Sequence, residues 1–361
     1  MKMTQKLHEL RQSLWLDNIS KEMLDKGILK RYIEEFSITG LTSNPTIFDH
    51  AIAHSHFYDR SIVELSSQGM EAEELFFELA MDDLRRAADL FRPIHDQTSC
   101  RDGWVSLEVS PLLAYDAEKT LFEAKRLYEA FQRPNLYIKI PGTKEGLPAI
   151  EEAIFEGIPI NVTLLFTPEH YKEAAEAYMR GLERRLAKGL PLDVVSSVAS
   201  LFVSRWDKAT MHVVPENLKN QLGIAIAKKT YKFYRDLLDS DRWNILAQKK
   251  ANPQLLLWAS TGTKDPQASD ILYVKNLIAP DTINTMPEET LLAFADHGQI
   301  GAILPRDGAD ADVVLSEFCQ HGVDYQALGE RLQKEGAEAF VNSWKDLLNS
   351  LQQKSSLLKT V

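Results

Sequence analysis

Eight short apolar segments recur along most of this chain, and between them lie stretches with the spacing of amphipathic helices. Several of the segments run almost without a polar interruption, as expected for parallel strands that helices cover on both faces. The expected strands are residues 14–18, 38–44, 104–110, 136–141, 159–167, 194–204, 255–261 and 282–286. This alternation predicts an α/β fold, and eight strand–helix units are typical of a (β/α)8 barrel, or TIM barrel.

The connections indicate helices beyond the basic barrel. Residues 45–103 and 205–253 each leave room for more than one helix, and a tail at about 310–361 has the pattern of two or three more. No break in composition marks a second domain, so we expect residues 1–361 to form one barrel domain. The rival is a doubly wound open sheet, whose first strand should run into a glycine-rich phosphate turn. No such turn follows residues 14–18.

Charge and composition narrow the function. The net charge of −11 argues against nucleic acid as a partner, because such interfaces need clustered basic residues. No apolar run approaches eighteen residues, the start lacks the apolar core of a signal peptide, and the two cysteines have no disulfide or metal spacing. We therefore expect a soluble cytoplasmic protein that contacts no membrane. An anionic substrate would require a local basic site in so acidic a chain.

One lysine stands out in the strand at 136–141. Side chains of a barrel strand point alternately to the helices and to the interior, so if Leu136, Ile138 and Ile140 face the helices, Lys139 points inward. A lysine near a strand end often extends to solvent instead. Here it lies between two isoleucines, just before a Pro-Gly turn. Removing water from an ammonium group favours the free amine that a nucleophile requires.

The same alternation turns other polar side chains inward near the carboxyl ends of their strands. They are Asp17, Asn44, Glu108, Asn161 and Thr163. Any one of them is more often a strand-end or capping residue than a catalyst. Buried polar groups are costly without partners, however, so a cluster of carboxylates, amides and one amine predicts an active site.

Several motifs carry a family resemblance, in order from about Trp15 to Ser260. The segment at 40–45, Gly-Leu-Thr-Ser-Asn-Pro, resembles the G-x-T-[ST]-N-P signature of transaldolases. Residues 137–147 resemble the family's Schiff-base lysine motif, and 160–166 resemble the following strand. Residues 105–109 are similar to the strand that carries the catalytic glutamate. Residues 200–205, Ser-Leu-Phe-Val-Ser-Arg, are similar to the family's S-P-F-V-[GS]-R segment.

This resemblance implies a transferase of the non-oxidative pentose phosphate pathway. Lys139 would attack the ketone of sedoheptulose 7-phosphate or fructose 6-phosphate and keep a dihydroxyacetone unit as an enamine. That unit would pass to an aldose phosphate, glyceraldehyde 3-phosphate or erythrose 4-phosphate. Asp17 would act as acid and base at the cleaved bond, and Glu108 with Thr163 would position a proton-carrying water. Asn44 and Asn161 would hold hydroxyls of the bound unit. The imine nitrogen is itself the electron sink, so no cofactor or metal is expected.

The phosphate site departs from the best-known form of the family. By the resemblance, Arg205 and Ser260 match the family's phosphate-binding arginine and serine, and Ser200 belongs to the same substrate-binding set. A second arginine is expected two residues after that serine, but Gly262 stands there. Lys264 is the nearest substitute, as a point charge instead of a planar fork. A solvated loop lysine is the alternative interpretation.

Two other functions compete with transfer. The first is a class I aldolase that releases dihydroxyacetone from fructose 6-phosphate. The small relatives with that activity carry glutamine and tyrosine where this chain has Glu108 and Phe202, which favours the transferase. The second is a catalytically silent barrel, which the intact polar set makes a poor match. His50 and His54, one helical turn apart, are interpreted as a solvated helix face and not as a metal site. A monomer and a homodimer both remain open.

Overall fold

The computed structural model describes residues 2–358. Within them eight parallel strands close into a barrel in the order of the sequence, with β1 paired to both β2 and β8. The strands are β1 (Gln12–Asp17), β2 (Ile38–Thr42), β3 (Val105–Glu108), β4 (Leu136–Pro141), β5 (Ile160–Leu165), β6 (Ser197–Phe202), β7 (Leu255–Ala259) and β8 (Thr282–Met286). All eight expected strands are confirmed, although most are shorter than predicted, and the open-sheet alternative is excluded.

Helices surround the barrel and lengthen its connections. Up to β6 they are α1 (Met3–Glu9), α2 (Lys21–Asp25), α3 (Ile28–Phe36), α4 (Pro45–Ala53), α5 (Asp59–Ser67), α6 (Ala72–Gln97), α7 (Ala117–Phe131), α8 (Gly146–Glu156) and α9 (Pro168–Ala187). After β6 they are α10 (Ser204–Thr210), α11 (Leu222–Leu238), α12 (Asp241–Gln248), α13 (Leu272–Asn276), α14 (Glu288–His297), α15 (Ala311–Gln320) and α16 (Tyr325–Leu358). The short 3₁₀ turns η1 (Pro111–Leu113) and η2 (Glu216–Leu218) complete the set.

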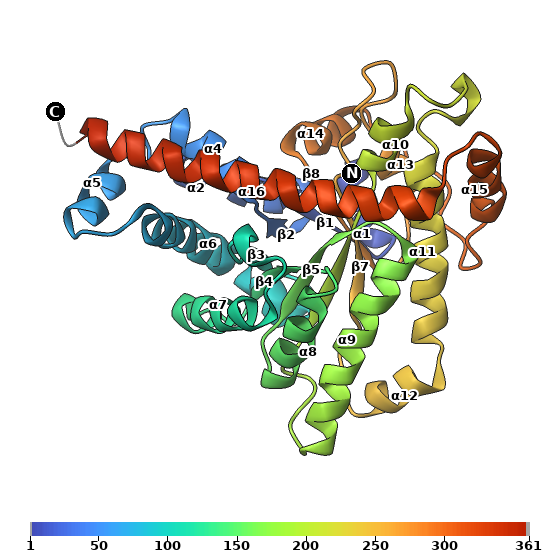
Figure 1. Ribbon diagram of the computed structural model, residues 1–361, viewed down its shortest axis with the longest axis horizontal. Helices are drawn as coiled ribbons and strands as arrows, with labels where there is room; N and C mark the ends of the chain where they lie inside the picture. The colour runs from blue at the N-terminus through green and yellow to red at the C-terminus, as the bar shows by residue number, and fades with distance from the viewer. Residues whose placement is uncertain (1, 359–361) are drawn as a thin grey trace.

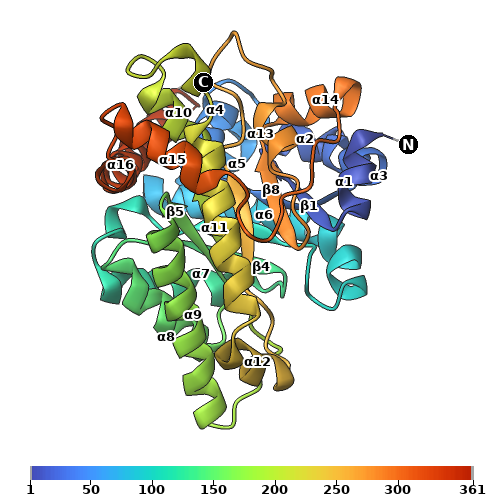
Figure 2. The ribbon, with the colours of Figure 1, turned by 90° about the vertical axis from the view of Figure 1, so that its right-hand side faces the viewer.

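The extra helices lie where the long connections predicted them. The first long connection forms α4, α5 and α6, and the second forms α10, α11 and α12. Figures 1 and 2 show α9 and α11 side by side on the outside of the barrel. None of the helices within residues 2–358 is long and apolar enough to cross a membrane.

The predicted helical tail forms two helices, α15 and α16, and its last residues, 359–361, lie outside the described part of the chain, as does Met1. The surprise is the position of α16, which is 34 residues long. It runs across the molecule beside the barrel, from α15 to the region of α4 and α5 (Figure 1). The sequence pattern showed that this helix has an apolar face but not what that face covers.

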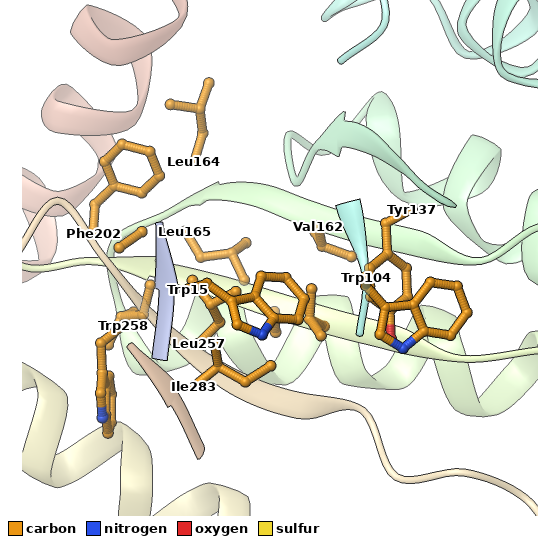
Figure 3. Packing of buried hydrophobic residues seen from close by; sticks show 14 of the residues in the cluster. Trp15, Trp104, Tyr137, Val162, Leu164, Leu165, Phe202, Leu257, Trp258 and Ile283 are labelled. Atoms are coloured by element: carbon orange, nitrogen blue, oxygen red, sulfur yellow. The ribbon is translucent and has the colours of Figure 1, made fainter. Parts of the chain in front are cut away.

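Large aromatic side chains fill part of the barrel interior. Trp15 and Tyr137 stack at 6.2 Å between ring centroids, and Trp104 stacks on Tyr137 at 4.1 Å. Figure 3 shows Trp15 near Leu257 and Ile283 of β7 and β8. A Cβ atom on Gly40 would lie 2.5 Å from the Trp15 ring, so only glycine fits there. The glycine that opens the G-x-T-S-N-P motif is therefore required for packing. The polar residues that follow it lie toward the carboxyl end of β2.

Candidate active site

The carboxyl ends of the strands surround one pocket of about 390 Å³, a size typical of small-molecule sites. The side chains that line it come from all of the strands except β3, from the loops that follow them, and from α16. The lining residues are Asp17, Thr42, Asn44, Thr46, Ile47, Lys139, Thr163, Ser200, Phe202, Arg205, Ala259, Ser260, Gly262, Lys264, Thr285, Pro287 and Phe340. This end of the barrel is where TIM-barrel enzymes carry their active sites.

Lys139 lies in the barrel interior, as the alternation in its strand predicted. The residue is 5% exposed, and its Nζ donates hydrogen bonds to Glu108 Oε2 at 3.0 Å and to the Ser43 carbonyl oxygen at 3.3 Å. Glu108 does not line the pocket, but its carboxyl group contacts Lys139, which does. Burial raises the pKa of the Glu108 carboxyl, while the Lys139 ammonium lowers it and the charge of Asp17 raises it further.

Asp17 is the last residue of β1 and lies on the pocket wall. The Thr42 hydroxyl, at the end of β2, donates a hydrogen bond of 2.7 Å to its Oδ1. Burial raises the pKa of Asp17, against the opposing effects of Lys139, the Thr42 hydrogen bond and Lys264. A raised pKa brings a carboxyl group closer to the range in which a general acid and base works best.

Two buried oxygens of predicted site residues have no hydrogen-bond partner within residues 2–358. They are Glu108 Oε1 and Thr163 Oγ1. Thr163 comes from β5, whose residue Asn161 is the register partner of Lys139. Unpartnered buried polar atoms are rare in folded proteins and often mark a site that binds a ligand or water.

The two predicted amides have different surroundings. Asn44 caps α4 by accepting a hydrogen bond of 3.2 Å from the Ile47 amide, and it lines the pocket. Asn161 is fully buried and is not among the lining residues. Its Nδ2 donates to Ser106 Oγ at 3.1 Å, and its Oδ1 accepts from Ser200 Oγ at 2.7 Å. The structure thus connects Asn161 to the pocket through Ser200.

The basic groups lie on the wall formed by β6, β7 and their loops. Arg205 is half-buried at the start of α10, and burial lowers the pKa of its guanidinium. Its guanidinium lies 5.6 Å from the ring centroid of Phe202. Ser260 accepts or donates a hydrogen bond of 2.9 Å with Ser204. Lys264 is exposed and lines the same pocket. Within the described residues neither basic side chain is paired with a carboxylate.

Sequence reasoning missed several of the lining residues, of which Phe340 is the most notable. Its ring comes from α16, and the centroid lies 5.3 Å from Lys139 Nζ. Thr285 of β8 was also missed, and its hydroxyl lies 2.6 Å from the Thr42 hydroxyl. Thr285 lies on the strand predicted at 282–286, and the alternation there could have turned its side chain inward. No local signal in the tail distinguishes Phe340 from other apolar residues of that helix.

Comparison with known proteins extends these observations. A sequence model of the Transaldolase/Fructose-6-phosphate aldolase family matches residues 14–351. A protein of Nostoc sp. named Transaldolase 2 is 40% identical, over 98% of each chain. Proteins named Transaldolase from Parafrankia sp. and Thermobifida fusca are both 43% identical; the first alignment covers 94% of this chain and 95% of its relative, and the second covers 97% of each. With a family match over most of its length and relatives this similar from end to end, the chain belongs to the transaldolase/fructose-6-phosphate aldolase family.

Proposed function

We propose that this enzyme transfers a dihydroxyacetone unit from a ketose phosphate to an aldose phosphate through an imine at Lys139. The observation that carries the proposal is the position of Lys139: a buried amine in the barrel interior, hydrogen-bonded to a buried carboxyl and opening onto a sugar-sized pocket. The family match and relatives named transaldolase over nearly the whole chain favour transfer over release of free dihydroxyacetone.

The first step is attack of the Lys139 amine on the ketone carbon of the donor, with loss of water. Glu108 is hydrogen-bonded to this nitrogen and Thr163 lines the same pocket, and each has an unpartnered oxygen, Glu108 Oε1 and Thr163 Oγ1. We assign these two oxygens to the water that carries protons during the step. Such proton transfer by positioned groups typically contributes about 10²–10⁴-fold to a rate.

The second step is cleavage of the bond between C3 and C4 of the donor. Asp17 accepts the proton of the C4 hydroxyl as the aldose phosphate leaves, and the electron pair of the broken bond moves to the imine nitrogen as an enamine. In the reverse direction the enamine carbon attacks the acceptor aldehyde, and Asp17 returns the proton. Asn44, and Asn161 through Ser200, are assigned to the hydroxyls of the bound unit.

Arg205, Ser260 and Lys264 are assigned to the phosphate of donor and acceptor. All three residues line the pocket. Within residues 2–358 neither the Arg205 guanidinium nor the Lys264 ammonium is paired with a carboxylate, so both can bind a phosphate. We also propose that the chain acts as one domain in the cytoplasm, because α15 and α16 pack onto the barrel and both cysteines are free.

The test is reduction of the enzyme by borohydride in the presence of fructose 6-phosphate, followed by mass mapping of the modified lysine. We expect the adduct on Lys139 and none in a Lys139→Arg variant that keeps its thermal transition. An adduct on Lys144, Lys264 or another lysine would contradict the assignment of the nucleophile.

A further inference from the structure

Hydrogen bonds at two points hold the helix α16 across the mouth of the pocket. In its first half, Gln333 Nε2 donates hydrogen bonds to the carbonyl oxygens of Leu164 at 3.0 Å, near the end of β5, and of Gly142 at 3.1 Å, just after β4. Nearly three turns later, Ser343 Oγ accepts a hydrogen bond of 2.9 Å from Thr46, in the first turn of α4. The stretch between these contacts is therefore held over the site.

Glycines allow this stretch to lie close to the barrel. A Cβ atom on Gly336 would lie 3.0 Å from Leu164 Cδ2 and 3.5 Å from Arg205 Nη1. Seven residues earlier, a Cβ on Gly329 would lie 2.2 Å from Thr167, which is too close for any side chain. Residues seven apart share one face of a helix, so α16 turns a small-residue face toward the active-site loops.

One large side chain on the pocket side of α16 reaches the reacting nitrogen. Phe340 is 7% exposed, lines the pocket, and has its ring centroid 5.3 Å from Lys139 Nζ. The other close partners of this nitrogen are the Glu108 carboxyl and the Ser43 carbonyl oxygen. The nitrogen thus has polar acceptors from the barrel and an aromatic ring from the C-terminal helix.

We propose that Phe340 is an active-site residue that stabilises the positively charged imine on Lys139 through the face of its ring. This inference rests on the proposed function, because it requires the imine to form at Lys139. The protonated imine is the species that draws electrons from the C3–C4 bond, and it must carry its charge at Lys139, a residue that is only 5% exposed. The negative face of an aromatic ring attracts a cation at this distance, and the attraction is stronger where water is excluded.

The test compares three variants by borohydride trapping and by turnover. Phe340→Leu keeps an apolar side chain but loses the ring, whereas Phe340→Tyr keeps the ring. Leu347→Val removes one methylene from the buried side of α16 outside the pocket, and so measures the effect of loosening the helix. Each enzyme is reduced at saturating fructose 6-phosphate, the fraction modified at Lys139 is followed by mass, and thermal unfolding is recorded in parallel.

We expect Phe340→Leu to lower the rate of trapping and kcat by roughly 3- to 20-fold, the range given by a cation–π contact of ordinary strength. Phe340→Tyr should recover most of that loss, and Leu347→Val should not reproduce it. Three results would overturn the inference: trapping by Phe340→Leu at the unmodified rate, an equal loss in Leu347→Val, or no recovery in Phe340→Tyr. Absence of any Lys139 adduct in the unmodified enzyme would instead refute the proposed function, and this inference with it.

Discussion

Lys264 offers the sharpest test of the phosphate site, because Gly262 stands where the resemblance to transaldolases leads us to expect a second arginine. A Cβ atom on Gly262 would lie only 3.7 Å from Lys264 Nζ. The Lys264 ammonium group thus lies within contact distance of the position that the Cβ atom of a side chain at 262 would occupy. We expect Lys264→Ala to weaken the use of phosphorylated acceptors, and Gly262→Arg in the same variant to restore part of the loss.

The expected magnitude follows from the exposure of the two cations. A hydrogen bond to a charged group contributes about 1.5–3 kcal/mol, or roughly 10- to 150-fold. Lys264 is exposed and Arg205 is half-buried. Screening by solvent places Lys264 near the lower limit, so we expect about a tenfold loss in kcat/KM. Arg205→Ala should cost more, toward a hundredfold.

The assay compares glyceraldehyde 3-phosphate with unphosphorylated glyceraldehyde as acceptor for the same donor. Only the phosphorylated acceptor should respond to Lys264→Ala. Lys275→Ala is the matched control, since that lysine is hydrogen-bonded to Gln299 outside the pocket. A Cβ at 262 would also lie 3.2 Å from Pro287, so the restored arginine requires a small shift there. Equal losses with both acceptors, or unchanged kinetics, would refute the assignment of Lys264 to phosphate.

Four further predictions address other groups. Glu108→Gln and Thr163→Ala should slow imine formation by about 10²-fold or more in single-turnover trapping, with KM nearly unchanged, because both handle protons through water; a change in KM alone would argue against this role. Asp17→Asn should trap an adduct with the mass of the intact ketose phosphate, because cleavage stalls; a three-carbon adduct formed at the normal rate would argue otherwise. Phe202→Tyr should release free dihydroxyacetone without acceptor, since a hydroxyl near the enamine can hold the water that protonates it; release that stays as slow as in the unmodified enzyme would contradict this. Asp83 is buried, and within residues 2–358 the Tyr58 hydroxyl is the only hydrogen-bond partner of its carboxyl, whose pKa is raised by burial to about 7. The unfolded chain loses this proton near pH 4, so the stability that the protonated carboxyl contributes is lost as the pH rises toward 7. Asp83→Asn and the unmodified enzyme should therefore have the same free energy of unfolding near pH 4. At pH 8 the free energy of unfolding of the variant should be higher, by at most about 4 kcal/mol. A difference that stays constant across this range would refute the titration of Asp83.

The strands were predictable because their residues obey one simple constraint. Strands covered on both faces must be apolar, and the alternation of side chains then identifies each inward polar residue, as it did for Lys139, Asp17 and Thr163. Strand ends were less certain, because apolar residues continue past them. The segment predicted at 194–204 forms a strand only at Ser197–Phe202. Val203 has a helical backbone conformation, and α10 begins after it.

Contacts between distant segments could not be predicted from these patterns. The apolar stripe predicted in the tail indicated a buried face. Of its residues, Phe340, Trp344, Leu347 and Leu351 are buried and Leu348 is half-buried. That stripe carries no information about which surface covers it, so the approach of Phe340 to Lys139 emerged only from the fold. The left-handed backbone of Leu164, with φ of 60°, is a similar case, since nothing in an apolar run marks the residue where the register of β5 shifts.

This acidic chain can bind the anionic substrates proposed for it because dissolved salt screens the long-range repulsion between them. At physiological ionic strength exposed charges are screened beyond roughly 8 Å, so most of the net charge of −11 has little effect at the pocket. Inside the pocket the balance is different. Arg205 and Lys264 place two basic side chains on its wall, and burial raises the pKa of both carboxyls near Lys139, Asp17 and Glu108. The two basic residues therefore supply the local positive charge that an anionic substrate requires in so acidic a chain.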